Sequence, residues 1–278
     1  NPQIMLNEEA RKDLASGDYL FGCGTMDMKF GIAADIEILK KAEKELKNFS
    51  GNILFVSVPD EEKNSAGMLS AVDLLLSLKK EKQLEYTCCL VSEPMFPKYP
   101  GDKNKYLYTG TVGKILPVFY CVGRGAHVCE PFSSLNPNRL TSKIIEKIDS
   151  NPELSDRING VFTPAPVCLK QSDTKTTYSA QISTASYTYF NFMTVTKAPH
   201  EVMQDMLVIA EEAFEEVIAD LRKNAERLSN ISGNILEIPD VDPKVVTFQE
   251  LYQLCSETHN EDFESHMKEF INQYVQDG

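Results

Sequence analysis

Residues 53–67 read ILFVSVPDEEKNSAG, a continuous apolar run that ends at a proline and opens into an acidic turn. The run at 53–58 is apolar at almost every position, which is typical of a strand buried on both faces of a parallel sheet. A helical pattern over about 32–50 precedes it, and a second apolar helix is expected at about 66–79. After that helix, YTCCLV at 86–91 repeats the pattern of a buried strand. This alternation predicts an α/β unit with a mostly parallel sheet flanked by helices.

The second half of the chain shows a different order of elements. A strand is expected at 113–122, and an Asn-Pro pair is a good opening for a helix at 137–149. Two strand-like stretches follow at about 164–172 and 178–196, the second rich in β-branched and aromatic residues. An amphipathic pattern then predicts a long helix over about 200–229. This β-α-β-β-α order is typical of an inserted α+β domain.

Composition and charge narrow the class of protein. The chain has 278 residues, which at roughly 150 residues per domain gives about two domains. It carries 28 basic and 41 acidic residues, and its net charge of −13 repels nucleic-acid phosphates and anionic membranes. No apolar run is long enough to span a bilayer, no signal peptide is visible, and the seven cysteines form no CxxC pair. We therefore expect a cytoplasmic protein with reduced thiols and no nucleic-acid or membrane partner.

Acidic residues occupy equivalent positions in the predicted parallel sheet. Asp27 lies in a glycine-rich loop before a helix, Glu61 and Glu62 follow one buried strand, and Glu93 follows the next. In open α/β sheets, ligands bind beyond the carboxyl ends of the strands, so these carboxylates would converge on one edge. Closely spaced carboxylates repel one another unless a cation neutralises them, which favours a divalent metal site. The alternative is that DEEK at 60–63 is only a solvated charged turn.

Two further features suit hydrolytic chemistry. Adjacent Glu61 and Glu62 allow one carboxylate to bind a metal while the other takes a proton from the activated water, and their spacing does not say which does which. His127 lies in a glycine-rich sequence together with Arg124, and this pair could stabilise an oxyanion. The alternative for His127 is an exposed histidine at the end of a strand.

Four motifs follow one another along the chain: GCGTMDMKFG at 22–31, VPDEEKNSAG at 58–67, VSEP at 91–94 and GRGAHVCEP at 123–131. Through them the chain resembles the co-catalytic zinc metallopeptidase and amidohydrolase family. Members of that family include acetylornithine deacetylase, succinyl-diaminopimelate desuccinylase, aminoacylase and glutamate carboxypeptidase. FGCGTMDMK, together with PFSSLNPN at 131–138, is closest to the arginine-utilisation branch.

The resemblance implies a fold and a reaction. It implies an incomplete catalytic α/β domain at 1–112, an inserted α+β lid and dimerisation domain at 113–229, and a return to the catalytic domain at 230–278. The implied reaction is hydrolysis of an amide or peptide bond by a metal-bound hydroxide. The implied substrate is small, an N-acyl amino acid or a short peptide.

The resemblance also implies roles for individual residues. Asp27 is implied to bridge two metal ions, Glu62 and Glu93 to bind one metal each, and Glu61 to act as the general base. His127 is implied to reach the active site of the partner in a homodimer and to polarise the scissile carbonyl there. The implied cofactors are two Zn2+ ions per active site, with Co2+ or Mn2+ as alternatives.

Two departures from the family pattern concern the metal ligands. The family has a His-x-Asp motif some tens of residues before the bridging Asp, and a final His near its C-terminus. Only 26 residues precede Asp27, none of them His, and neither His259 nor His266 has the right context. We therefore expect either a fragment lacking both ends of the catalytic domain, or a degenerate, non-catalytic member acting as a dimerising binding or regulatory module. A single-metal, esterase-like hydrolase is a further alternative.

Another departure concerns substrate binding. Many members carry Asp-x-Arg-x-x-Pro on a lid strand, where the Arg grips a substrate carboxylate. The matching stretch here is TVTKAP at 194–199, so Thr196 replaces the Arg, and Lys197 would face the opposite side of a strand. We therefore expect that a free α-carboxylate is not bound by the usual contact.

Overall fold

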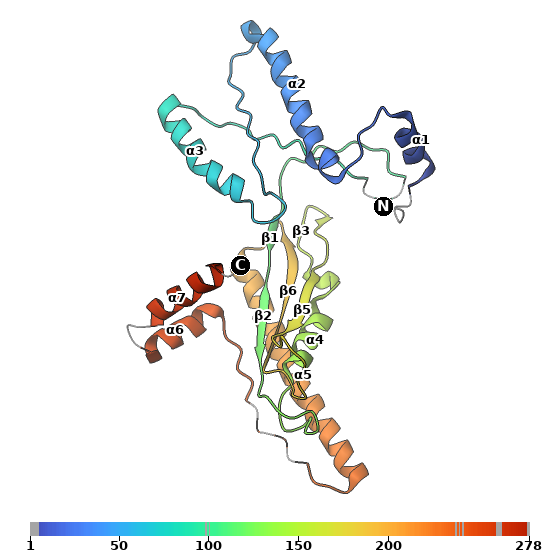
Figure 1. Ribbon diagram of the computed structural model, residues 1–278, viewed down its shortest axis with the longest axis vertical. Coiled ribbons are helices and arrows are strands. Elements are labelled where there is room, and N and C mark those ends of the chain that lie inside the picture. Colours follow the sequence, from blue (N-terminus) through green and yellow to red (C-terminus); the bar gives the residue numbers. More distant parts are fainter. Residues whose placement is uncertain are drawn as a thin grey trace. The chain divides into compact units, whose positions relative to one another are not determined.

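The computed structural model describes residues 6–97, 99, 101–236, 238, 240, 242–259 and 263–276. The chain divides into two compact units, residues 1–107 and residues 108–278, which we call the first and the second unit. Among the described residues, helices occur in both units and strands in the second, so the chain is a mixed α/β protein (Figure 1). None of the helices in this part of the chain is both long and apolar enough to cross a membrane.

Helices supply the regular structure of the first unit. The unexpected helix α1 (Glu8–Ser16) is capped by Asn7, whose side-chain oxygen accepts a hydrogen bond of 2.8 Å from the next turn. The unit continues with the π-helical turn η1 (Thr25–Phe30), helix α2 (Gly31–Lys44), the 3-10 turn η2 (Leu46–Asn48) and helix α3 (Ala66–Lys82). Both helices predicted for this part of the chain are confirmed, although α2 ends earlier than expected.

The strands predicted for the first unit require a correction. Residues 53–58 and 86–91 lie outside every strand, and Figure 1 draws these runs before and after α3 as coil. Their apolar side chains are partly or largely exposed, Leu54 at 47% and Leu90 at 86%. A strand exists only where a neighbouring backbone completes its hydrogen-bonded ladder, and none of the described residues does so here. The mostly parallel sheet is therefore not found in the described part of the chain, whose sheets are antiparallel.

The second unit is built on an antiparallel sheet. Its central strand β6 (Ala185–Thr194) pairs on one edge with β5 (Val167–Asp173) and on the other with β1 (Gly113–Ile115) and β2 (Val118–Val122). β1 and β2 follow one another along the same edge and are separated near Pro117, since proline has no N–H to give to a ladder. The strands predicted for this part of the chain are thus confirmed, with the first one split in two and the last one beginning at Ala185 instead of at about 178.

A small hairpin lies apart from this sheet. β3 (Arg157–Ile158) pairs with β4 (Val161–Phe162) across Asn159 and Gly160, whose φ values are 49° and 80°. Asn-Gly is a favoured two-residue hairpin turn because both residues tolerate positive φ.

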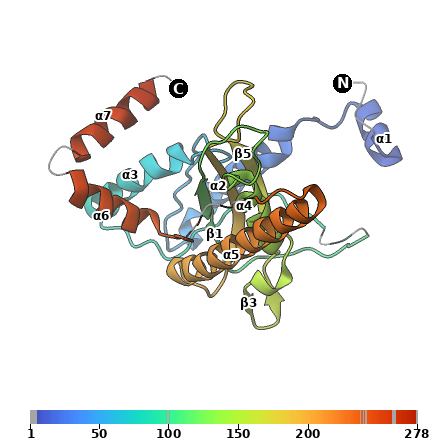
Figure 2. The same cartoon turned by 90° about the horizontal axis from the view of Figure 1, so that it is seen from below.

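Two helices cover one face of the main sheet. Helix α4 (Pro137–Ile148) and helix α5 (Pro199–Ser232) pack against β6, and Figure 2 shows them together on one side of the strands. Side chains alternate along β6, so that Phe190 and Phe192 are fully buried while the residue between them is half-buried. The core of this unit joins the three elements: Ile144, Ile148, Phe190, Phe192, Val202, Met206 and Ala213.

Ion pairs connect α4 and α5 along their outer side. Basic residues four positions apart on α4 meet acidic residues four positions apart on α5, because this spacing places side chains on one helix face. The nitrogen–oxygen distances are 3.0 Å for Lys147–Glu212, 2.7 Å for Lys147–Glu216, 3.6 Å for Lys143–Glu216 and 3.8 Å for Arg139–Asp220. We call these residues the ion-pair row. Its longest ion pair is that of Arg139.

Two helices end the described chain. Helix α6 (Phe248–His259) and helix α7 (Phe263–Gln276) contact each other through the rings of Tyr252 and Phe263, whose centroids are 5.2 Å apart. The predicted return of residues 230–278 to the first domain stays a prediction.

Candidate functional site

Asp27 lies in the turn that leads into helix α2. It is extended (φ −113°, ψ 99°), Met28 after it also departs from helical geometry within η1, and the peptide bond between the two residues is cis. Gly31, the first residue of α2, packs so closely on Ser92 that a Cβ at Gly31 would overlap the Ser92 carbonyl oxygen. The Ser92 hydroxyl also donates a hydrogen bond of 2.7 Å to the Asp35 carboxylate on α2. These contacts bring the Asp27 turn to the segment that carries Glu93.

A tight turn presents Glu61 and Glu62 to solvent. Asp60 opens this turn at φ 69°, and its backbone oxygen accepts a hydrogen bond of 2.7 Å from the Ser65 N–H. Its carboxylate accepts a second bond of 3.3 Å from the Ala66 N–H, at the start of α3. Asp60 therefore stabilises the N-terminus of α3, while Glu61 and Glu62 are exposed.

The predicted site residues of the first unit lie close enough for their charges to act on Glu93. Desolvation raises the pKa of Glu93 above its ordinary value, and the negative charges of Asp27, Glu61 and Glu62 raise it further. The fold thus brings together carboxylates that are far apart in the sequence. They are not arranged as a ready metal cluster, because no three His, Cys, Asp or Glu side chains in the described residues are placed to hold a metal ion. Their roles as ligands and base stay predictions.

His127 lies in the second unit, on the loop after β2. An isolated β-bridge joins it to Gln181, and the Ile182 N–H donates a hydrogen bond of 2.8 Å to the carbonyl of Ala126. The Nδ1 atom of His127 accepts a hydrogen bond of 3.2 Å from the Cys129 N–H, so in the neutral ring the proton sits on Nε2. The ring is exposed, which leaves Nε2–H as a donor for an oxygen atom of a ligand.

The other candidate cations and histidines are less informative. Arg124, which the sequence pairs with His127, is exposed. His200 and His266 are exposed on helices α5 and α7. The side chain of His259 lies outside the described residues.

Asp156 anchors the stretch in which Thr196 replaces the family's arginine. Its carboxylate accepts hydrogen bonds from the backbone N–H groups of Val195 (2.7 Å), Thr196 (2.6 Å) and Lys197 (2.8 Å), and from the Thr196 hydroxyl (2.6 Å). Burial raises the pKa of Asp156, but these hydrogen bonds outweigh burial and hold the pKa well below its ordinary value. The Nζ atom of Lys197 lies 2.6 Å from the Asp205 carboxylate. Thr196, at the arginine position, and its neighbour Lys197 therefore both contact carboxylates of this chain.

Sequence reasoning missed Asp156 and Gly31 for different reasons. The partners of Asp156 lie 39 to 41 residues further along the chain, so no local pattern marks it. Gly31 carried a usable signal, because glycine inside a helix costs about 1 kcal/mol relative to alanine. A glycine at the start of an otherwise strong helix indicates close backbone packing, which is what the structure shows.

Comparisons with known proteins agree with the motifs. The chain matches the model of Peptidase family M20/M25/M40 over residues 6–275. It is 40% identical over 247 residues to the uncharacterized protein YqjN of Bacillus subtilis (strain 168), an alignment that covers 89% of this chain and 44% of YqjN. It is 35% identical over 210 residues to protein RocB of the same bacterium, covering 76% of this chain and 37% of RocB.

A more distant similarity points to the same family. A succinyl-diaminopimelate desuccinylase of Buchnera aphidicola subsp. Cinara cedri (strain Cc) is 31% identical over 152 residues, covering 55% of this chain and 38% of the desuccinylase. The chain spans less than half the length of each of these relatives. The family model matches nearly the whole chain, and the chain therefore belongs to peptidase family M20/M25/M40.

Proposed function

We propose that this chain is part of a metal-dependent hydrolase that cleaves an amide or peptide bond in a small substrate. The observation that carries the proposal is the contact of helix α2, which follows the Asp27 turn, with the segment of Glu93, together with the nearby charges of Asp27, Glu61 and Glu62. Membership of peptidase family M20/M25/M40 supports hydrolysis. The similarity to a succinyl-diaminopimelate desuccinylase supports a small, N-acylated substrate.

The acidic side chains suit a divalent metal in part. Asp27, Glu62 and Glu93 are the residues that would hold it, because each offers oxygen donors and a cation would relieve their mutual repulsion. Zn2+ is the proposed metal, with Co2+ or Mn2+ as alternatives. Carboxylates without imidazole suit harder cations better than zinc, so tight zinc binding requires ligands beyond these three. When bound, the metal would polarise the scissile carbonyl and lower the pKa of a water molecule.

Glu61 and His127 have complementary proposed roles. Glu61 is exposed next to the proposed ligand Glu62, so its carboxylate can take the proton of the attacking water and pass it to the leaving nitrogen. The Nε2–H of His127 would donate a hydrogen bond to the carbonyl oxygen as negative charge develops there. Its Nδ1 is already held by the Cys129 N–H, which fixes the ring for this task.

A homodimer through the second unit is part of the proposal. The sheet face opposite α4 and α5 carries large apolar side chains on β2, and Val118, Tyr120 and Val122 are 63–65% exposed. An exposed apolar patch of this kind marks an interaction surface in many proteins. In such a dimer, His127 of one subunit would act in the partner's active site.

The relatives and the Asp156 contacts bear on the proposed substrate class. Similarity to RocB supports the arginine-utilisation branch. An N-acyl amino acid or a short peptide is the substrate that we propose. Thr196 donates to Asp156, and Lys197 pairs with Asp205. Neither side chain is therefore assigned the task of gripping a free α-carboxylate.

The alternative is a non-catalytic, dimerising module for binding or regulation. The observation that favours it is the lack of a three-residue metal cluster in the described part of the chain. Such a module would keep the fold of the second unit and would not need the carboxylates of the first.

The test uses the protein encoded by the full open reading frame that contains this chain. Its metal content is measured by mass spectrometry, and its turnover on a panel of N-acyl amino acids and dipeptides. Glu61→Gln should lower kcat by about 10²–10⁴-fold, as loss of a general base does, with the metal content unchanged. Glu85→Gln, at another exposed glutamate of the first unit, is the matched control and should leave kcat unchanged. A folded dimer with neither metal nor turnover would instead establish the non-catalytic alternative.

A further inference from the structure

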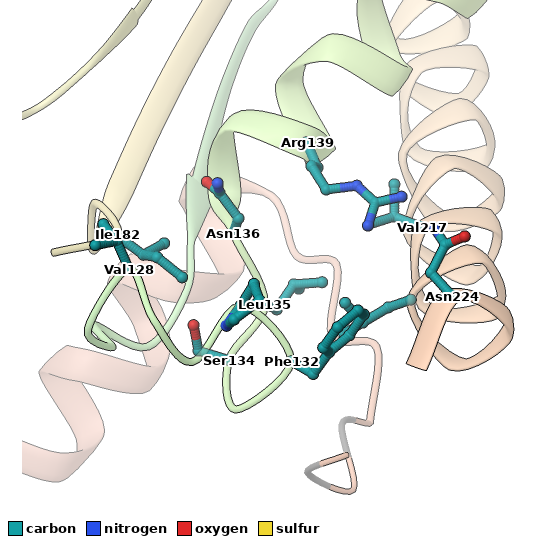
Figure 3. Close-up of a pocket in the computed structure, with 11 residues that line it drawn as sticks. Val128, Phe132, Ser134, Leu135, Asn136, Arg139, Ile182, Val217 and Asn224 are labelled. Atoms are coloured by element: carbon teal, nitrogen blue, oxygen red, sulfur yellow. The ribbon is translucent and has the colours of Figure 1, made fainter. Parts of the chain in front are cut away.

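A cavity of about 510 Å³ lies within the second unit, between the loop after β2, the start of α4 and helix α5 (Figure 3). Small-molecule sites typically have volumes of about 300–1,000 Å³. The wall is mostly apolar and includes Val128, Phe132, Leu135, Ile182, Val217 and Leu221. Much of it comes from PFSSLNPN at 131–138, a motif to which the proposed hydrolysis assigns no task.

Ser134 is a buried polar residue in this wall. Its relative exposure is 1%, and its Oγ makes no hydrogen bond to any other described residue. In Figure 3 its hydroxyl points toward the space ringed by the lining side chains. Buried hydroxyl groups are nearly always hydrogen-bonded, so this unpaired one gains a bond if its side chain rotates toward a partner in the cavity, since the Oγ itself is covered in the ligand-free chain.

Nitrogen donors surround the same space. The Nη2 atom of Arg139 is 3.8 Å from the Asp220 carboxylate, beyond hydrogen-bond distance. Asn136 uses its Oδ1 to accept a bond of 3.0 Å from the Asn138 N–H, which leaves its NH2 group available. Asn224 makes no side-chain hydrogen bond to another residue that the structure describes, and Figure 3 shows it with Arg139 on the α5 side of the cavity. The polar lining groups thus offer mainly donors, which fits a ligand rich in acceptors.

We propose that this cavity binds a small amphipathic carboxylic acid with an aromatic or aliphatic body. The carboxylate lies at Arg139 and Asn224, and the apolar body packs against Phe132 and Leu135. An oxygen atom at the other end of the ligand pairs with the Ser134 hydroxyl once that covered side chain has rotated toward the cavity. Hydrogen bonds from a guanidinium to a carboxylate are charge-assisted, so Arg139 favours an acid over the matching neutral amide. The site lies entirely in the second unit, and its binding test does not require hydrolytic activity.

Calorimetric titration of the complete 278-residue chain tests the charge preference. The probes are 4-phenylbutyrate and 4-phenylbutanamide, which differ in the charge of the head group. The acid should bind at least about 10-fold more tightly than the amide, because its bonds to Arg139 are charge-assisted. Arg139→Gln should remove this difference. Lys143→Gln, one turn away in the ion-pair row and not part of the cavity wall, is the matched control and should change the affinity by less than about 2-fold.

Two further variants test the depth and the position of the site. 4-(4-Hydroxyphenyl)butyrate should bind about 3-fold or more tightly than 4-phenylbutyrate, since its phenol can pair with Ser134. Ser134→Ala should abolish that advantage and raise the melting temperature of the ligand-free chain, because an unpaired buried hydroxyl is removed. Asn224→Phe, at an exposed position of α5, should block the cavity and abolish binding while circular dichroism stays unchanged.

Each alternative result overturns the proposal. Equal affinity for acid and amide would show that Arg139 does not recognise a carboxylate. Full binding to Asn224→Phe would place the probes elsewhere, for example on the exposed apolar side chains of the first unit. The absence of any saturable heat with both acids would show that the cavity does not take this class of ligand.

Discussion

The two units of this protein differ in how far their apolar side chains are buried. In the second unit, Phe190 and Phe192 are fully buried between β6 and the two covering helices. In the first unit, Leu69 is 68% exposed and Leu90 86%, and Gly31 is the one described residue classed as buried. Both units have apolar patterns in their sequences. An apolar pattern therefore indicates that a segment is suited to burial. It does not indicate that the element which buries the segment lies in the same stretch of chain.

The difference lies in where the partners of each strand are found. β6 has neighbours on both edges, and all of them come from residues 113–173 of the same unit. The runs at 53–58 and 86–91 have no such neighbour among the described residues. We therefore expect the second unit to carry most of the stability of this chain, and the following predictions test that expectation.

Phe190→Ala should have the largest effect on stability. Deleting a fully buried phenylalanine costs about 3–5 kcal/mol, because the transfer free energy is lost and a cavity remains. Leu90→Ala, at a side chain that is 86% exposed in the first unit, should change stability by no more than about 0.5 kcal/mol. Calorimetric unfolding of the complete chain measures both. Equal losses from the two variants would contradict the difference between the units.

Asp156→Asn should have the next largest effect. The asparagine keeps the shape of the side chain but loses the charge that accepts bonds from Val195, Thr196 and Lys197. Hydrogen bonds to charged groups contribute about 1.5–3 kcal/mol, so we expect a loss of about 2 kcal/mol at neutral pH. Hydrogen exchange at the end of β6 should increase at the same time. Unchanged stability would show that the loop does not depend on this carboxylate.

The same contact predicts a pH dependence with a defined sign. The hydrogen bonds hold the pKa of Asp156 below its unfolded value of about 3.9. A lowered folded pKa contributes stability that is complete above the unfolded pKa and is lost as the pH falls toward the folded pKa. The stability difference between the unmodified chain and Asp156→Asn should therefore be constant between pH 5 and 7 and should shrink below about pH 4. A difference that grows in acid would contradict this assignment.

The sequence predicts elements better than it predicts their partners. The Asn136-Pro137 opening located α4, and the alternation along β6 matches its buried and half-buried sides. The apolar runs of the first unit were misjudged, because continuity of apolar residues reports a need for burial rather than a neighbouring strand. For the candidate site, the motifs grouped Asp27 with Glu93, and the roles of both as metal ligands stay predictions. They could not show that Asp60 belongs to the start of α3, since this depends on the geometry of its turn.

Gly31→Ala tests the one position of the first unit that is buried among the described residues. Alanine usually favours a helix, but here its Cβ would overlap the Ser92 carbonyl and push α2 away from Glu93. If the proposed metal site is correct, metal affinity of the full-length protein should fall by about 10-fold or more, as with loss of other supporting contacts around a metal. Gly51→Ala is the matched control, because its Cβ would meet only the Phe49 ring at 3.5 Å. Equal metal affinity in both variants would remove Gly31 from the support of the site.

Lys147→Gln should have the smallest effect on stability. It tests whether ion pairs contribute to the difference in stability between the units. Lys147 lies 2.7 Å from Glu216 and 3.0 Å from Glu212, and its side chain is only 20% exposed. Exposed ion pairs contribute about 0.2–1 kcal/mol, so this more sheltered one should reach the upper part of that range. Lys40→Gln in the first unit removes the pair with Glu37, in which both side chains are more than 60% exposed, and its effect should be close to zero. Calorimetric unfolding at low salt and in 1 M NaCl measures both variants. The Debye length falls to about 3 Å in 1 M salt, so the stability loss from Lys147→Gln should be smaller there. A loss from Lys147→Gln as large as that from Phe190→Ala would show that the ion-pair row, and not the apolar core, holds the second unit together.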